Sequence, residues 1–411
     1  MDQRQARAFH IAATTKLEPN NGRWRVPSQT GTGTYTVLVT RDGSWTCSCP
    51  DHEERLLACK HIMAVEITVQ RESGRTKVTY TELVRVTYSQ NWSAYNAAQT
   101  NEKAMFVKLL ADLCRLVPSP PHVMGRPRLP LSDMTFAAIY RTYARCSARR
   151  FTSDLRDAED KGLIERAPSF NSVLRYTRED DMTAVLTNLL ELSSLPLRAV
   201  ETQFAIDSSG FGTSNMRTWF STKHGREVRE REWRKVHAMC GTSTHIVTAA
   251  VVTPSASNDA PHLPELVATT AGNFPNVREV SADKGYLSRA NADAIEKHGA
   301  TPYIAFKSNT VEPPEGSAWA RMYHLYAYQR DEFLTHYHRR SNVETVFSMV
   351  KAKFGDGLLG KTLTAQTNEV LGKFVAHNLC VLIQSFHELG IDPTFDSQSA
   401  PAQKLAVQSG F

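Results

Sequence analysis

The sequence predicts an α/β fold in which a mixed β-sheet is flanked by helices. Three observations indicate this fold class. Residues 203–306 begin with strand-like segments and then alternate helix-like and strand-like ones, and residues 337–351 follow as an amphipathic helix. A mostly helical stretch, residues 86–195, and a module bearing Cys and His, residues 1–85, precede the sheet. Strands followed by alternating helices and strands are typical of a mixed sheet that helices cover.

Residue type and periodicity predict each element of the sheet region. The first strand, Gln203–Asp207, precedes Ser208, Ser209 and Gly210, which are typical of a turn. The run His245–Val252 is nearly continuous Ile, Val, Thr and Ala, as in a strand. The remaining expected elements are a strand over Trp233–Cys240, a helix over Pro261–Ala271, a strand over Val277–Asp283, a helix over Ser288–His298 that Gly299 ends, and a strand over Tyr303–Phe306.

The segment from Tyr337 to Lys351 carries the most informative pattern in the chain. Arg340, Glu344 and Lys351 follow Tyr337 at offsets of three, seven and fourteen residues. At about 100° per residue in an α-helix, the four side chains fall within an arc of roughly 60°. An apolar stripe able to pack on a sheet runs beside them and consists of Val343, Val346, Phe347 and Val350. One carboxylate among two cations and a phenol suits a site where metal ions and phosphates meet.

Two further carboxylates, Asp207 and Asp283, stand at the C-terminal ends of expected strands beside turns that contain Gly. Such positions project from the sheet edge at which α/β folds place their sites. Together with Glu344, they can hold two divalent ions about 3.5–4 Å apart, which activate a water or hydroxyl and stabilise the leaving oxygen of a phosphodiester. The alternative is that both aspartates only cap the turns that follow them.

These residues resemble the catalytic motifs of DDE transposases from bacterial insertion sequences. The third motif of one group, Tyr-x-x-Arg-x-x-x-Glu-x-x-x-x-x-x-Lys, matches from Tyr337 to Lys351, and Ile206–Gly210 and Ser281–Tyr286 resemble the first two. The resemblance covers residues 196–385 and implies an RNase H-like catalytic domain over residues 196–390. Only 61 residues separate Asp283 from Glu344, so the large β-rich insertion that some relatives carry has no room here.

The resemblance also implies a reaction and a role for each residue. Asp207, Asp283 and Glu344 are the expected catalytic acids and ligands of two Mg²⁺ ions, with Mn²⁺ as a substitute. The residues expected to contact DNA phosphates are Tyr337, Arg340 and Lys351. For Tyr337 the alternative is a structural role, in which its ring is packed and its hydroxyl lies at the surface. The expected reaction is cleavage of double-stranded DNA at the terminal inverted repeats of a transposon and strand transfer into target DNA, by a homodimer. Two other interpretations stay open: a domesticated relative that binds DNA without cutting it, and a metal-dependent nuclease without strand transfer.

A second motif, near the N-terminus, places Cys47 and Cys49 ahead of Cys59 and His61. Cys47 and Cys49 are two residues apart in an extended segment, so both side chains point to one face. A predicted hairpin leads into them, with strands over Tyr35–Thr40 and Ser44–Cys47 and a turn at Asp42-Gly43. Three thiolates and one imidazole make a closed tetrahedral zinc site, which is structural rather than catalytic. On the residues alone His52 is a rival fourth ligand, and three reduced core cysteines are the alternative to a metal site. The pattern resembles the SWIM zinc finger, which favours His61.

Residues 86–195 are predicted to be mostly helical. Ser132-Asp133 and Ser153 are expected helix caps, and amphipathic segments follow at Ser169–Tyr176 and Asp181–Leu192. Basic residues are dense in the arm Gly125–Pro130, in the run Lys223–Lys235, and at Arg141, Arg145, Arg149, Arg150 and Arg156. Such helices suit either a DNA-binding bundle that reads transposon ends or a spacer with solvated arginines. Both interpretations stay open, as does which module reads DNA.

Composition limits the cellular compartments in which the protein is expected. Three of the seven cysteines belong to the zinc motif and four are scattered, which argues against a secreted disulfide framework. The N-terminus has no apolar signal core, and no stretch approaches the roughly eighteen apolar residues of a membrane span. The expected setting is therefore the cytoplasm, with the protein on the DNA of the prokaryotic nucleoid and no membrane partner. A net charge of +6 permits nucleic-acid binding without establishing it, and residues 391–411 are expected to be a loosely ordered tail.

Overall fold

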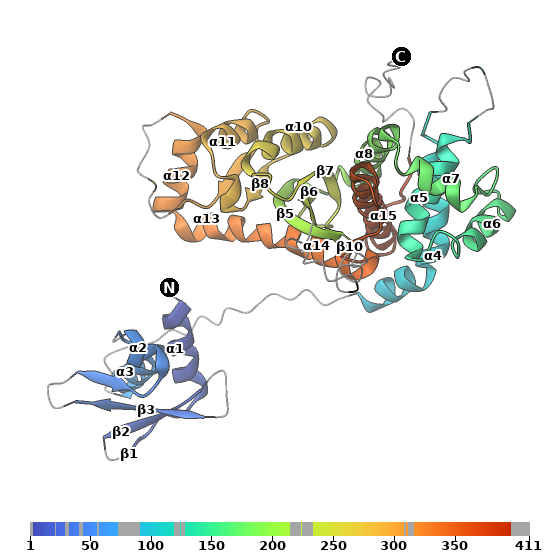
Figure 1. The fold of residues 1–411 in the computed structure, drawn as a ribbon. Coiled ribbons are helices and arrows are strands. Elements are labelled where there is room, and N and C mark those ends of the chain that lie inside the picture. Colours follow the sequence, from blue (N-terminus) through green and yellow to red (C-terminus); the bar gives the residue numbers. More distant parts are fainter. Residues whose placement is uncertain are drawn as a thin grey trace. The chain divides into compact units, whose positions relative to one another are not determined.

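The computed structural model divides into two compact units, Met1–Tyr88 and Ser89–Phe411, which are described separately (Figure 1). The described residues are 3–20, 22–28, 33–40, 44–55, 57–72, 91–118, 124, 128–213, 223, 233–307, 310 and 316–395. The expected turn Asp42-Gly43, part of the basic arm, nearly all of the run from Lys223 to Trp233, and the tail from residue 396 lie outside them. Within the described part of the chain, no helix is long and apolar enough to cross a membrane.

In its described residues, the N-terminal unit is a small antiparallel sheet with three helices. The strands lie in the order β1 (Pro19–Asn20), β2 (Arg23–Pro27), β3 (Thr34–Val39) and β4 (Trp45–Cys47). The helices are α1 (Gln3–Thr14), α2 (Pro50–Arg55) and α3 (Lys60–Glu72). The expected hairpin is confirmed, because β3 pairs antiparallel with β4 and Val37 lies opposite Cys47. A small core that contains Trp24, Val26 and Val65 also contains the three cysteines of the zinc motif.

The large unit contains the predicted mixed sheet. Its strands lie in the order β7 (Val247–Pro254), β6 (Trp233–Gly241), β5 (Gln203–Thr213), β8 (Glu279–Ala282) and β9 (Thr301–Ile304), and β10 (Gly357–Leu358) pairs with β5. β5, β6 and β7 are antiparallel neighbours, whereas β8, β9 and β10 join the sheet in parallel pairs. The sheet therefore changes from antiparallel to parallel at β5, which is its central strand.

Side chains of β5 alternate between the two faces of the sheet. Phe204 and Ile206 belong to a core with α10 (Leu263–Asn273), α11 (Arg289–Glu296) and α12 (Ala318–Tyr328). Ala205 and Phe211 belong to a second core with α8 (Asp180–Ser194), α14 (Ser341–Phe354) and α15 (Leu363–Leu389). Because the side-chain period of a strand is two, Asp207 and Ser209 face the same side as Ala205 and Phe211. The first candidate catalytic residue thus points to the α14 side of the sheet.

The helical stretch shares its core with the sheet and surrounds α15 (Figure 1). Its helices are α4 (Trp92–Cys114), α5 (Leu131–Ala144), α6 (Thr152–Asp160), α7 (Phe170–Tyr176) and α8. α15 packs against α4, α5 and α8 on one side and against β7 on the other. The end of α14 is joined to these helices as well, since Lys353 pairs with Glu102 of α4 and Arg145 donates to the Lys353 carbonyl at 3.4 Å.

The expected caps of this stretch are wrong. α5 begins at Leu131, after Pro130, and Asp133 is buried, where its Oδ2 accepts the Glu165 N–H at 3.0 Å. α6 begins at Thr152, so Ser153 lies inside its first turn. Both serine and aspartate favour caps on sequence grounds, but the tertiary contact of Asp133 overrides that preference.

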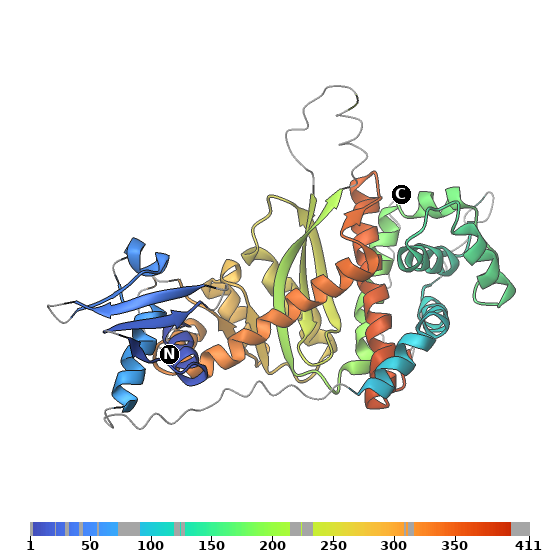
Figure 2. The same cartoon turned by 90° about the horizontal axis from the view of Figure 1, so that it is seen from below.

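The expected single helix from Tyr337 to Lys351 is also wrong in detail. The segment comprises α13 (Arg330–Tyr337), a 3₁₀ turn η4 (His338–Arg340) and α14. Glu279 of β8 accepts from Arg339 of this turn at 2.8 Å and contacts His336 at 2.8 Å, which holds the turn against the sheet. In Figure 2 the orange α13–α14 segment crosses the strands, and it contacts β9 through α13, β8 through η4 and β5 through α14.

Candidate active site and metal centre

The parallel pairing of β5 with β8 brings two acidic residues to one edge of the sheet. Ile206 pairs with Ala282, so Asp207 and Asp283 each follow the last paired residue of this ladder. Asp283 also has the turn-capping contact that was its alternative role, because its Oδ2 accepts the Gly285 N–H at 3.4 Å. Its other carboxylate oxygen, Oδ1, lies 3.9 Å from Nε of Arg340. One aspartate oxygen therefore serves the turn while the other faces the site.

Arg340 links all three candidate acids. Its Nη1 lies 2.7 Å from Oδ2 of Asp207 and 2.7 Å from Oε1 of Glu344, one helical turn further along the chain. Those two oxygens are therefore no further apart than twice that distance. The three carboxylates do not form a cluster whose ligand atoms all lie within 4.8 Å of one another. They surround a guanidinium group, which occupies the space between them.

Burial and like charge both act on Asp207, whose side chain is 17% exposed. Burial raises the pKa of Asp207, and the charges of Asp283 and Glu344 add to that effect, while the Ser208 N–H and Arg340 oppose it. Burial alone would lower the pKa of Arg340, but its contacts with Glu344 and Asp207 raise it. Arg340 is therefore the charged side chain that favours ionisation of Asp207 against burial and the two neighbouring acids.

Lys351 and Tyr337 lie on the two sides of this acidic group. Lys351 Nζ donates to Ser209 Oγ at 2.7 Å and lies 5.2 Å from the centroid of the Phe211 ring, so it contacts β5 just beyond Asp207. Burial lowers the pKa of Lys351. Tyr337 is partly buried and stacks on Phe333 at 6.1 Å, as its packed alternative predicts, and burial raises its pKa. The order along the sheet is therefore Tyr337, the acids around Arg340, then Lys351.

Behind Asp207, on the other face of β5, lies a buried polar network that the sequence did not indicate. Asp259 Oδ1 lies 2.7 Å from Lys235 Nζ and 3.4 Å from His237 Nδ1. His237 pairs with Ser208 across the β5–β6 ladder and lies 2.9 Å from the Tyr286 hydroxyl. Although burial opposes it, hydrogen bonds from Lys235 and Ser208 lower the pKa of Asp259.

This network joins the segment after Asp207 to the turn after Asp283. Asp259 reaches that turn directly, since a Cβ on Gly285 would lie 3.0 Å from its Oδ2. The available sequence signal was weak: His237 is a polar residue inside an otherwise strand-like run, and Asp259 stands in an ordinary turn sequence. Periodicity predicts which face of a strand such a residue lies on, but it does not predict which residue of another element it contacts.

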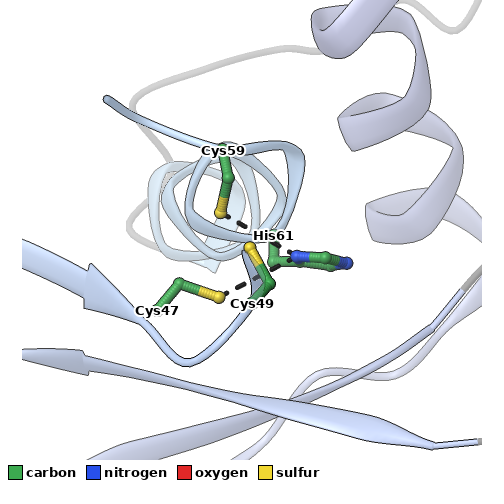
Figure 3. Close-up of side chains that lie close together, drawn as sticks. All are labelled: Cys47, Cys49, Cys59 and His61. Atoms are coloured by element: carbon green, nitrogen blue, oxygen red, sulfur yellow. Dashed lines mark hydrogen bonds between the residues drawn. The ribbon is translucent and has the colours of Figure 1, made fainter. Parts of the chain in front are cut away.

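The N-terminal motif forms a compact cluster of four side chains (Figure 3). The ligand atoms of Cys47, Cys49, Cys59 and His61 all lie within 4.8 Å of one another, and all four residues are buried. Nδ1 of His61 lies 3.8 Å from Sγ of Cys47 and 3.8 Å from Sγ of Cys59. A hydrogen bond from Cys47 lowers the pKa of Cys59 against the effect of burial, with His61 adding to it. Three sulfurs and one ring nitrogen at this spacing fit a tetrahedral Zn²⁺ site.

The structure decides between the two candidate histidines. His52 Nδ1 lies 2.8 Å from the carbonyl oxygen of Leu57, and His52 is not in the cluster. His61 enters the cluster because Cys59 and His61 flank the start of α3, which directs both side chains towards the end of β4. Its Nε2 is buried and has no hydrogen-bond partner within the described part of the chain. The other nitrogen, Nδ1, is the one that faces the sulfurs.

Two family models match separate parts of the chain. Residues 198–379 match the transposase DDE domain, and residues 35–70 match the SWIM zinc finger. No solved structure is similar enough to the chain to match it. The first match contains the sheet, α14 and the acids around Arg340, and the second contains the Cys₃His cluster. The chain is therefore similar to transposases with a DDE domain over residues 198–379, whose RNase H-like fold agrees with the mixed sheet, and to SWIM zinc fingers over residues 35–70.

Proposed function

We propose that this protein cuts phosphodiester bonds of double-stranded DNA at the ends of a transposon and joins those ends to target DNA. Asp207, Asp283 and Glu344 are the proposed catalytic acids. The observation that carries the proposal is that these three side chains, from β5, the residue after β8, and α14, surround a single cationic group. The three residues lie up to 137 positions apart in the sequence, so it is the fold that brings them to one charge.

The same three carboxylates are the proposed ligands of two divalent ions. Carboxylate oxygens are the ligands that Mg²⁺ and Mn²⁺ prefer, and the position of Arg340 supports the assignment because the space between the acids already holds positive charge. When bound, a pair of such ions lowers the pKa of the attacking water and stabilises the leaving oxygen. Asp207 and Asp283 hold their positions through the β5–β8 ladder, and Glu344 through the packing of α14 on β5.

Arg340 and Lys351 are the proposed phosphate ligands. The planar guanidinium of Arg340 forms two-pronged contacts with carboxylates and phosphates alike, so the group now held by Asp207 and Glu344 can transfer to a DNA phosphate. Lys351 contacts Ser209 and the Phe211 ring, two and four residues beyond Asp207, and this second cation close to the acids supports its assignment as a phosphate ligand. Tyr337 positions η4 by packing on Phe333.

The remaining proposals concern the setting of the reaction. Two transposon ends must be joined together, so a homodimer is the proposed active form, acting on the DNA of the prokaryotic nucleoid. Zn²⁺ is the proposed ion of the Cys₃His cluster, where it has a structural role because all four ligands come from the protein. The acids and the zinc cluster thus have separate metals of different chemistry.

The test compares wild type with Asp283→Asn on labelled duplexes taken from the DNA that flanks the coding sequence, with Mg²⁺ or Mn²⁺ added. The matched control is Asp293→Asn, which removes an exposed carboxylate from α11. Wild type and the control are expected to cut near the repeat boundary. Asp283→Asn is expected to lose roughly 10–100-fold or more in rate, because removing even an outer-shell partner of a bound metal costs roughly that much. Undiminished cutting by Asp283→Asn would exclude Asp283 from the site.

Joining is tested separately with a supercoiled target plasmid. A transposase leaves the labelled end covalently attached to the plasmid, whereas a nuclease of similar fold leaves only cut DNA. A domesticated relative that binds without cutting leaves neither product.

A further inference from the structure

A large cavity in the helical region is lined by six arginines. Its volume is about 1260 Å³, and it lies between α6, α7 and the segments that precede each of them. We call it the arginine cavity, after Arg128, Arg149, Arg150, Arg156, Arg166 and Arg175. The sequence marked the first four of these as basic residues of the helical region without assigning them a common surface. Folding brings all six side chains to the lining of the same cavity.

The charge of this cavity is almost entirely positive. All six arginines are exposed, and the one acidic residue of the lining is Glu179. Among the residues that the structure describes, none of the six takes part in an ion pair. Six guanidinium groups with one carboxylate among them repel one another, and an anion that enters the cavity reduces this repulsion.

The walls of the arginine cavity are held in place independently of any ligand. Arg149 lies over the Phe170 ring at 5.1 Å, and Arg175 lies over the Tyr176 ring at 5.4 Å, which fixes the planes of two guanidinium groups. The loop between α6 and α7 is tied down because Glu159 Oε2 accepts the Ala167 N–H at 3.1 Å. Preformed donors lose less entropy when they bind a ligand.

A second cavity continues the first towards the catalytic sheet. Its volume is about 350 Å³, it shares Arg149 and Phe170 with the arginine cavity, and it extends to Lys361. Lys361 follows β10, which pairs with Gly212 and Thr213 at the end of β5. β5 is the strand that carries Asp207. The two cavities therefore adjoin, and the second extends to the segment that follows the β10 partner of β5.

We infer that the arginine cavity binds the sugar-phosphate backbone of the duplex DNA that the acidic site cuts. This inference rests on the proposed function and adds a second DNA contact to it. Guanidinium groups match phosphates in charge and geometry, and the cavity exceeds the roughly 300–1,000 Å³ of ordinary small-molecule sites. Backbone contacts of this kind position a duplex without reading its bases.

The test uses the full chain with zinc present and no added Mg²⁺, so that binding is measured without cutting. The probe is a fluorescent 40-base-pair duplex of arbitrary sequence, titrated at several NaCl concentrations. The test variant is Arg149→Gln with Arg150→Gln and Arg166→Gln. The matched control, Arg115→Gln with Lys161→Gln and Arg198→Gln, removes the same charge from exposed positions of the same region that line neither basic cavity.

The cavity variant is expected to bind at least tenfold more weakly than the control in roughly 0.1 M salt. The slope of log affinity against log salt is expected to fall by about 0.9 for each phosphate that the variant no longer neutralises. Equal affinity and equal slope for the two variants would overturn the inference. So would a weakening for single-stranded DNA as large as that for the duplex, because the cavity would then recognise phosphate without duplex geometry.

Cutting is assayed on the same preparations, which separates this inference from the proposed function. If the cavity variant loses duplex binding while wild type cuts no substrate, the cavity is a DNA site and the proposed chemistry fails. If wild type cuts and both triple variants bind alike, the chemistry stands and the cavity has no part in it.

Discussion

Arg340 donates a hydrogen bond to Asp207 across 2.7 Å, and the same nitrogen lies 2.7 Å from Glu344. A residue expected to bind DNA phosphate is thus paired with two residues expected to bind metal ions. The same guanidinium cannot hold the carboxylates while cations occupy the space between them. If the proposed roles hold, metal binding to the acids and the release of Arg340 towards DNA are linked steps, and this linkage can be measured.

Replacing Arg340 by Gln is expected to lower the melting temperature in the absence of divalent ions, because three carboxylates lose their shared cation. Added Mn²⁺ or Mg²⁺ is then expected to raise the melting temperature of Arg340→Gln more than that of wild type, since no guanidinium competes for the acids. Thermal melts over a metal titration measure both effects. Arg321→Gln, which breaks an exposed pair with Glu296, serves as the control. An identical metal response in all three proteins would refute the linkage.

Replacing Asp259 by Asn is expected to destabilise the protein by about 1–3 kcal/mol, because the largely buried Lys235 loses its partner. Cutting is expected to slow as well, since Asp259 connects the segments that follow Asp207 and Asp283. The double variant Lys235→Met with Asp259→Asn removes both charges and is expected to recover part of the stability. Denaturant unfolding of wild type, the two single variants and the double variant gives the coupling energy between the two residues. A coupling near zero would show that the pair is not an interacting unit.

Replacing Cys59 by Ser is expected to abolish stoichiometric zinc binding and to unfold the N-terminal unit. That unit has its own core, which contains the three cysteines, so the transition of the large unit is expected to stay unchanged. The matched control is His52→Ala, which removes the rival histidine and is expected to keep its zinc. Metal analysis and thermal melts measure the two properties. Loss of zinc from His52→Ala with retention in His61→Ala would reverse the assignment of the fourth ligand.

Acid is expected to destabilise the large unit through two buried neutral histidines. Burial lowers the pKa of His237 to about 4, with His262 adding to the effect, and burial likewise lowers the pKa of His377 to about 4. Unfolding restores an ordinary pKa near 6.5, so the unfolded chain binds more protons between these values. Stability is therefore full above about pH 6.5 and falls as the pH drops towards 4, by about 3 kcal/mol for each histidine.

The variant His377→Gln isolates one of these contributions. Glutamine can still donate to the His245 carbonyl oxygen, which His377 Nε2 contacts at 3.0 Å, but it does not titrate. The free energy of unfolding of this variant is expected to depend on pH less steeply, by about one proton between roughly pH 4 and 6.5. His298→Gln, at an exposed position after α11, is expected to leave the slope unchanged. The same slope in His377→Gln and wild type would show that His377 is not buried in its neutral form.

Local sequence patterns predicted the mixed sheet and the Cys₃His cluster well. The apolar stripe of α14 is a property of neighbouring residues, so it can be read from the chain directly. The order of strands followed by alternating helices and strands also limited the topology. Each of these features depends on the spacing of residues that are near one another in the sequence, and that spacing is the same in the folded chain. The turn expected at Ser208–Gly210 is wrong, because β5 continues through these residues to Thr213 and pairs with β6 along them.

Contacts between distant residues explain what the sequence missed. Asp259 meets Lys235 and His237 only because β6 and the segment after β7 lie together, and no local pattern records that meeting. The break at η4 depends on Glu279, which lies 60 positions earlier in the chain and pulls Arg339 to the sheet. Asp133 was expected at a helix cap and instead binds the Glu165 N–H of another loop. Polar residues that satisfy such distant partners are the least predictable from local sequence.

The long helix α15 has a consequence for the distance along the DNA between the site of binding and the site of cutting. It fills the core of both the helical region and the catalytic sheet, and α14 is tied to α4 and α5 through Lys353 and Arg145. The basic cavities and the acids therefore belong to one compact unit, Ser89–Phe411. If one duplex contacts both the arginine cavity and the acids, the protein fixes the number of base pairs between the bound part of the DNA backbone and the bond that is cut.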